Sequence, residues 1–165
     1  MNARQTIVAI LLIAAIGGYA AYSLGFIAGG DYEWTTVEIE DSETGDRLAT
    51  VDARVADDFA KRYTGLSDTA SLEENEGMLF VHDETDSHTY VMRDMDFPLD
   101  IIFIDADGQI TEIHSAPTEP DADSLTEYRG EGMYVLEVNE GFAERHNVSV
   151  GNRVQIDLDE RRDDR

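Results

Sequence analysis

The stretch PLDIIFIDADGQITEIH, residues 98–114, decides the fold. It holds an apolar run at 101–104, a turn segment at 105–108 that ends in Asp-Gly, and a second run at 109–114 with β-favouring residues. An Asp-Gly pair between two such runs is a strong signal for a hairpin turn. The stretch therefore predicts an antiparallel β-hairpin, and the rest of the chain is interpreted around it.

Further short strands are predicted on both sides of this hairpin. Residues 31–55 predict another hairpin, with its turn at 41–46. About seven short strands and two short helices predict a mainly β fold, a compact antiparallel sandwich or barrel. The other predicted segments are a helix at 56–63, a loop at 67–77, strands at 78–81, 90–92, 100–105, 133–138 and 150–158, a surface excursion at 115–132 and a helix at 141–146.

Several separated motifs resemble the domain of unknown function 192 family over roughly residues 51–158. They are Gly77-Met-Leu-Phe, Val91-Met-Arg-Asp, Pro98-Leu-Asp-Ile-Ile-Phe-Ile-Asp, Tyr134-Val-Leu-Glu and Gly141-Phe-Ala-Glu-Arg-His. The resemblance implies a β-sandwich of jelly-roll type with short helices, and it implies no activity. The family usually reads Met-Lys-Asn-Thr where this chain has Met92-Arg-Asp-Met. Its frequent cysteine after the central hairpin is replaced here by the segment 116–123.

The charge balance indicates an unusual ionic habitat. Twenty Asp and sixteen Glu face eleven Arg and one Lys, a net charge of −24, and the acids are scattered rather than gathered in one block. In molar salt the Debye length falls to about 3 Å, which screens the self-repulsion of such a surface. We interpret the chain as an acidic protein of a halophile. Nucleic acid is disfavoured as a partner because phosphate binding needs clustered basic residues.

The N-terminal segment predicts a single transmembrane helix. Residues 7–28 carry no charge, and as a helix they would extend about 33 Å, the thickness of a bilayer core. Arg4 precedes the run and the next basic residue is Arg47, so the positive-inside rule places the N-terminus in the cytoplasm and the domain outside the cell. A cleaved signal peptide is the alternative. The predicted organisation is an anchor at 1–30, an acidic β domain at 31–160 and a tail at 161–165.

Two carboxylates adjoin apolar strand runs and stand out among the acids. Asp100 and Glu137 are candidate catalytic groups, because paired carboxylates serve as acid and base in hydrolases. With Met92, Arg93 and Asp94 they also form the candidate ligand-binding set, in which Arg93 can pair with a carboxylate. The competing interpretation is a structural ion pair, since so acidic a chain brings some carboxylates together by chance.

Soft donors provide a second candidate site. His82, His88, Met92 and Met95 combine imidazole and thioether groups, which suit copper(I), and His88 and Met92 would share one face of a strand. The alternative is that Met92 fills the core. No phosphate loop, nucleophile elbow or dinucleotide motif is present, and no cofactor is predicted. Asn147-Val-Ser is a glycosylation sequon that an extracellular location would expose.

These observations favour a non-enzymatic envelope module, which binds a saccharide, a small ligand or another protein while anchored in the cell membrane through residues 7–28. A carboxylate-based hydrolase of envelope polymers and a copper-binding domain are the alternatives. The first assignment rests on the general use of sandwich folds for binding.

Overall fold

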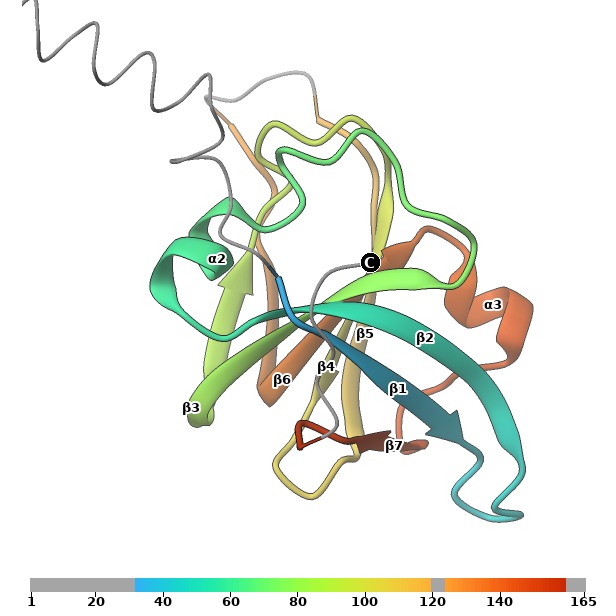
Figure 1. The fold of residues 1–165 in the computed structure, drawn as a ribbon. Helices are drawn as coiled ribbons and strands as arrows, with labels where there is room; N and C mark the ends of the chain where they lie inside the picture. Colours follow the sequence, from blue (N-terminus) through green and yellow to red (C-terminus); the bar gives the residue numbers. More distant parts are fainter. Residues whose placement is uncertain (1–31, 120–123, 160–165) are drawn as a thin grey trace, which may run out of the picture. The chain divides into compact units, whose positions relative to one another are not determined.

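The described part of the chain folds into one mainly β unit. The computed structural model describes residues 32–119 and 124–159, in which seven strands form a single sheet with the order β5-β4-β6-β3-β2-β1-β7 (Figure 1). The elements are β1 Trp34–Glu40, β2 Arg47–Ala56, α2 Phe59–Thr64, β3 Glu76–Tyr90, β4 Leu99–Ile104, β5 Ile110–Ala116, β6 Tyr128–Asn139, α3 Phe142–His146 and β7 Arg153–Ile156.

The first hairpin leads into the helix α2. β1 and β2 pair antiparallel, as the sequence predicts, and Asp41 organises the turn by accepting hydrogen bonds from the amides of Glu43 and Thr44. Asp58 caps α2 by accepting from the Lys61 amide, and Gly65 ends the helix at φ +55°. A cap of this kind gives a hydrogen-bond acceptor to an amide in the first turn that has no partner within the helix. The helix therefore begins at Phe59, three residues later than the predicted start at residue 56.

The crossover through α2 makes one strand pair parallel. β2 and β3 pair parallel over Asp52–Ala56 and Glu76–Phe80, because the helix and the following loop return the chain to the same end of the sheet. The expectation of a wholly antiparallel fold is therefore wrong at this pair. The described strands also belong to one sheet rather than to the two sheets of a sandwich.

Strands β3 and β6 are longer than the sequence predicts. Residues 76–90 form one strand, with an irregular register between Val81 and Asp86, whereas the sequence predicts two separate strands at 78–81 and 90–92. Residues 91 and 92 lie outside the strands, and β6 begins at Tyr128 inside the predicted excursion. Residues 86–90 of β3 pair with residues 128–132 of β6 through their backbones. Their side chains are mostly polar, so the sequence shows no alternation of apolar residues there and does not predict these parts of the two strands.

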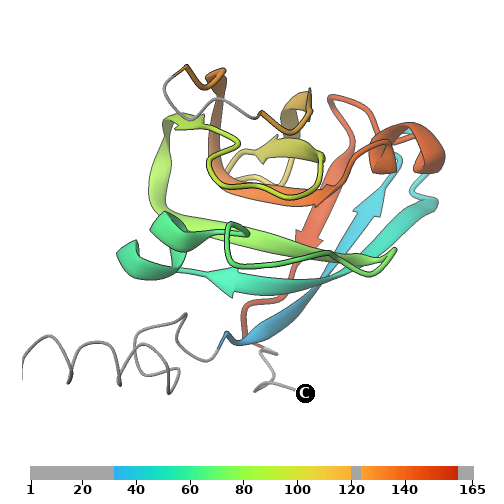
Figure 2. The ribbon, with the colours of Figure 1, turned by 90° about the horizontal axis from the view of Figure 1, so that it is seen from above.

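The ends of the sheet approach each other, so that the sheet curls into a half-barrel (Figure 2). The predicted hairpin at 98–114 is confirmed as β4 and β5. Its turn meets β7: the Val154 amide donates to the Gly108 carbonyl at 2.7 Å, and Gln109 forms an isolated bridge with Arg153.

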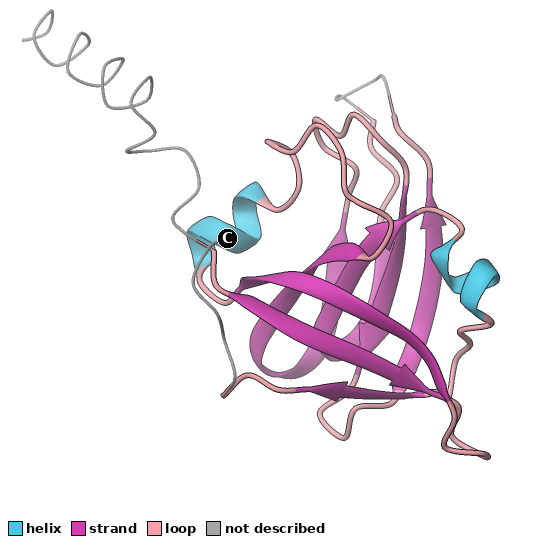
Figure 3. Ribbon diagram, turned by 45° about the vertical axis from the view of Figure 1, so that its right-hand side comes forward, coloured by secondary structure: helices cyan, strands magenta, loops and turns pink. Residues whose placement is uncertain are grey.

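Two apolar clusters pack on opposite faces of the sheet. The enclosed cluster joins residues such as Val37, Ile104, Leu136 and Val154, and Phe142 of α3 belongs to it. The outer cluster includes Met78, Phe80, Ile101, Phe103, Met92 and Leu66. The helices α2 and α3 lie at opposite sides of the sheet (Figure 3). The outer cluster is joined by Leu66 and Met92 from the connecting segments and by Tyr90 and Tyr128 at the ends of β3 and β6.

Replacement of Gly108 should weaken the contact between the hairpin and β7. Gly108 has φ +78°, and a Cβ there would lie 2.5 Å from the Val154 carbonyl oxygen. Gly108→Ala is expected to cost about 2 kcal/mol of unfolding free energy through strain and overlap. Gly45→Ala is the matched control, because Gly45 has φ +73° with no atom within 4 Å of its Cβ. Equal costs in guanidinium unfolding would contradict the proposed close contact.

The predicted membrane anchor at 7–28 and the tail at 161–165 lie outside the described residues. None of the helices within 32–119 and 124–159 is long and apolar enough to cross a membrane.

Candidate functional site

A pocket on the outer face of the sheet is the main candidate site. Its cavity volume is about 350 Å³, within the range usual for small-molecule sites. The lining combines residues of the strands β3, β4 and β6, of α2 with the segment after it, and of the segment 91–95. The lining residues are Phe59, Arg62, Tyr63, Thr64, Gly65, Leu66, Ser67, Phe80, His82, His88, Thr89, Tyr90, Val91, Met92, Arg93, Met95, Leu99 and Glu137.

Glu137 is a buried acid at the base of this pocket. It lies on β6 between Met78 of β3 and Ile101 of β4, and only 7% of the residue is exposed. Its carboxyl group forms no hydrogen bond with any described residue. Burial raises the pKa of Glu137 from 4.5 to about 8, because the charged form loses its hydration. The carboxyl group is therefore mostly protonated at neutral pH and can donate a hydrogen bond to a ligand.

Tyr90, His82 and His88 form a polar row beside Glu137. The Tyr90 hydroxyl lies 3.0 Å from Nε2 of His82, and the two histidine rings stack with centroids 3.6 Å apart. Desolvation lowers the pKa of His82 to about 4, with Coulombic contributions from His88 and Arg62. Burial, and then the nearby charge of Glu137, raise the pKa of Tyr90. At neutral pH the row carries no charge at His82 or Tyr90.

Two arginines supply positive charge to the lining. Nη1 of Arg62 donates to the carbonyls of Asp57 at 2.8 Å and Val81 at 2.7 Å. Arg93 donates to the Tyr63 carbonyl at 2.5 Å, and its guanidinium carbon lies 4.2 Å from the centre of the Tyr63 ring. Within the described ranges neither guanidinium forms an ion pair with a carboxylate. Backbone carbonyls and an aromatic ring thus fix both cations without neutralising them.

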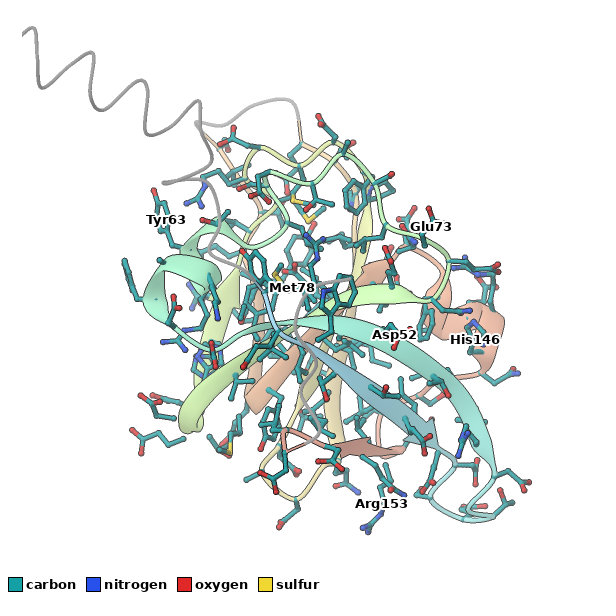
Figure 4. All side chains as sticks on the ribbon, viewed as in Figure 1. Asp52, Tyr63, Glu73, Met78, His146 and Arg153 are labelled. Atoms are coloured by element: carbon teal, nitrogen blue, oxygen red, sulfur yellow. The ribbon has the colours of Figure 1, made fainter. Side chains whose placement is uncertain are left out.

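Exposed aromatic side chains stand at the mouth of the pocket. Phe59 and Tyr63 are 78% and 62% exposed, and their rings stack with centroids 6.1 Å apart. They lie four residues apart, so α2 places them on one face. Tyr63 projects outward from α2 (Figure 4). An exposed aromatic pair beside a pocket is a favourable surface for a planar or apolar part of a ligand.

Asp100 does not belong to this pocket. In the paired strands Ile101 faces Glu137 and Asp100 faces Val138, and neighbouring side chains on a strand point to opposite faces. Asp100 accepts hydrogen bonds from the amides of Gly141 at 3.2 Å and Ala143 at 2.9 Å, at the start of α3. The candidate catalytic pair Asp100 and Glu137 is therefore separated by the sheet, and Asp100 serves as the cap of α3.

Asp94 and Asn147 have structural explanations. Both residues are exposed and have positive φ, 55° and 56°, a region that Asn and Asp tolerate better than most residues. Asp94 stands where the domain of unknown function 192 family usually has Asn, and the positive φ suits both residue types. Asp94 does not line the pocket, while Met92 and Arg93 do. The Asn147 side chain is accessible, and its glycosylation stays a prediction.

The four candidate copper ligands meet in the pocket, and the copper site stays a prediction. His82, His88, Met92 and Met95 all line it. Histidine binds metals through nitrogens in the ring plane, whereas these two rings face each other at an interplanar angle of 13°. Met92 is 1% exposed and packs in the outer cluster. No group of three or more His, Asp or Glu residues within the described ranges could hold a metal ion.

The sequence alone does not mark Arg62 or the aromatic pair on α2 as parts of a site. Phe59 and Tyr63 at helical spacing normally indicate a buried face, and nothing in the sequence indicates that they are exposed. Arg62 belongs to a helix end where basic residues are common. Only the structure shows that the Arg62 guanidinium forms no ion pair with a carboxylate of the described residues.

The chain is similar to known proteins over most of its length. A family model described as DUF192, uncharacterized ACR, matches residues 40–156. A crystal structure of a proposed transcription regulator from Sinorhizobium meliloti is 29% identical, with a TM-score of 0.69, covering 78% of this chain and 98% of that one. A protein of unknown function from Novosphingobium aromaticivorans is 27% identical, with a TM-score of 0.65, covering 79% and 96%. No curated protein matches the chain.

Proposed function

The chain belongs to the domain of unknown function 192 family, and because that family supplies no activity, we propose from the site itself that the domain is a non-enzymatic binding module for a small organic molecule. The observation that carries the proposal is the buried carboxyl group of Glu137, unpartnered among the described residues, at the base of the 350 Å³ pocket. The oxygens of Glu137 are not among the described side-chain atoms that are both shielded from solvent and without a partner, so they are reachable from the pocket, and a ligand that accepts the hydrogen bond of this carboxyl group would take the place of water there.

The surroundings of Glu137 favour binding over catalysis. A carboxylate hydrolase needs a second carboxylate in the same cleft, and among the described residues Glu137 is the single acid that lines this pocket. Of the other seventeen lining residues, nine are Phe, Tyr, aliphatic or Met, and seven are Arg, His, Ser or Thr. Such a composition is typical of sites that hold a ligand by shape and fix its orientation with few hydrogen bonds.

The setting of this module is part of the proposal. The apolar run at 7–28 would anchor it to the cell membrane of a halophile, with the domain on the extracellular side. The net charge of −24 would keep the domain soluble in molar salt. The same charge would repel DNA, so the description of the Sinorhizobium protein as a transcription regulator is not extended to this chain.

Thermal-shift measurements on the full-length chain in molar potassium chloride test the binding proposal. The panel contains single-ring aromatic compounds, neutral and acidic, and methyl glycosides. A ligand at about one hundred times its Kd should stabilise the fold by about 2.7 kcal/mol, a shift of several degrees.

A blocking variant locates the binding. Thr89 is exposed and lines the pocket, so Thr89→Trp should fill the mouth and abolish the shift. Thr50→Trp is the control, because Thr50 is an exposed strand residue outside the pocket. A shift that survives in Thr89→Trp, or no shift with any compound, would contradict the proposal.

A further inference from the structure

The charge of the pocket differs in sign from the charge of the protein. Acids make up 36 of 165 residues, yet Glu137 is the single acid among the eighteen described residues of the lining. Arg62 and Arg93 are the two permanent cations of that lining. Because burial holds the pKa of Glu137 at about 8, its carboxyl group contributes little negative charge at neutral pH. The pocket is thus a positive site on an acidic molecule.

The two guanidinium groups are held in place with hydrogen-bonding capacity to spare. Arg62 uses Nη1 for its contacts with the Asp57 and Val81 carbonyls, and within 32–119 and 124–159 its Nη2 and Nε donate no hydrogen bond. Arg93 uses Nη2 for the Tyr63 carbonyl and stacks on that ring. A guanidinium has five N–H donors and matches the oxygens of a carboxylate or phosphate well. An anionic ligand would therefore meet cations whose positions are already fixed.

The apolar part of the lining limits which anions fit. Phe59, Tyr63 and Val91 line the pocket and are 78%, 62% and 39% exposed, so they offer apolar surface that a ligand can cover. A small inorganic ion would leave this surface unfilled. An aromatic or aliphatic ring would cover it and gain the free energy of apolar burial.

We propose that the ligand of this module is a small organic acid, whose anionic group is bound by Arg62 and Arg93 and whose ring packs against the apolar lining above Glu137. This inference rests on the proposed binding function and names the chemical class of its ligand. The neutral carboxyl group of Glu137 supplies a hydrogen-bond donor to a second oxygen of the ligand, where an ionised acid would repel it.

Isothermal titration calorimetry with two matched probes tests the charge of the ligand. Benzoate and benzamide have nearly the same size and ring, and only benzoate is an anion at pH 7. With the full-length chain in molar potassium chloride, we expect benzoate to bind at least about tenfold more tightly than benzamide, since hydrogen bonds between charged groups are the stronger ones.

Arginine variants assign the effect to the pocket. Arg93→Gln should reduce the preference for benzoate over benzamide by about tenfold while leaving benzamide affinity nearly unchanged. Arg129→Gln is the control, because Arg129 pairs with Glu127 outside the pocket.

The outcomes separate this inference from the proposed function. Equal affinity for the two probes, or binding of a methyl glycoside alone, would overturn the organic-acid assignment and leave the binding function intact. Binding of no probe of any class would overturn both. A benzoate preference that Arg93→Gln leaves unchanged would also overturn the assignment.

Discussion

Glu137→Gln is expected to stabilise the domain increasingly as the pH rises. The pKa of Glu137 is raised from 4.5 to about 8 by burial. Below pH 4.5 the carboxyl group is protonated in both the folded and the unfolded chain, so its burial costs no ionisation. Between pH 4.5 and 8 only the unfolded chain releases the proton, and folding becomes progressively less favourable.

The size of this effect follows from the pKa difference. A shift of about 3.5 pKa units corresponds to a loss of about 5 kcal/mol between pH 4.5 and pH 8, of which about 1 kcal/mol is already lost at pH 5. The amide that replaces the carboxyl group in Glu137→Gln cannot ionise. The difference in unfolding free energy between the variant and the wild type should therefore change by about 4 kcal/mol in favour of the variant from pH 5 to pH 8.5.

Guanidinium unfolding at several pH values measures this difference. The change with pH, rather than the offset at one pH, isolates ionisation from any change in packing. Glu131→Gln is the control on the same strand, since Glu131 is exposed, and its difference from wild type should stay constant. If the Glu137→Gln difference also stays constant, the carboxyl group is not held in its neutral form by burial.

Asp100→Ala is expected to cost about 3 kcal/mol of stability without affecting ligand binding. Asp100 is 4% exposed, and its carboxylate caps α3 by accepting hydrogen bonds from the amides of Gly141 and Ala143. Its removal leaves two backbone donors without their partner, at about 1 to 3 kcal/mol each when they are buried. Gly141 stands at the N-cap and offers no side chain to replace it.

Asp100→Asn separates the structural role of this residue from a catalytic one. Asn keeps one acceptor oxygen, so the variant should recover roughly half of the lost stability. Benzoate affinity should equal that of the wild type in both variants under folding conditions, because Asp100 and Glu137 lie on opposite faces of the sheet. A loss of affinity without a loss of stability would place Asp100 in the binding site.

Local sequence patterns predict much of the fold, because glycines mark where the central hairpin turns and where α2 ends. Asp107-Gly108 fixes the hairpin of β4 and β5, and Gly65 ends α2, as the sequence indicates. No local pattern predicts that β2 and β3 pair parallel. Their pairing depends on which end of the sheet the chain reaches after α2 and the loop that follows it. The resemblance to the domain of unknown function 192 family is confirmed by the match over residues 40–156.

The candidate site could be predicted only in part. Met92, Arg93 and Glu137 are singled out by the sequence, and the structure brings them to one pocket. Asp100 looks equivalent to Glu137 in the sequence because both adjoin apolar runs, and only the register of β4 against β6 separates their faces. Arg62 and Tyr63 enter the site through the packing of α2, which no local pattern specifies.

The most direct test of the pocket as a ligand site is a methionine-methyl NMR titration of the full-length chain with benzoate at pH 7 in molar potassium chloride. Met92 and Met95 line the pocket, and Met133 does not. We expect saturable shifts of the Met92 and Met95 signals, no such shifts in Thr89→Trp, and a constant Met133 signal. Saturating benzoate that leaves Met92 and Met95 unmoved, or that moves Met133 alone, would contradict it.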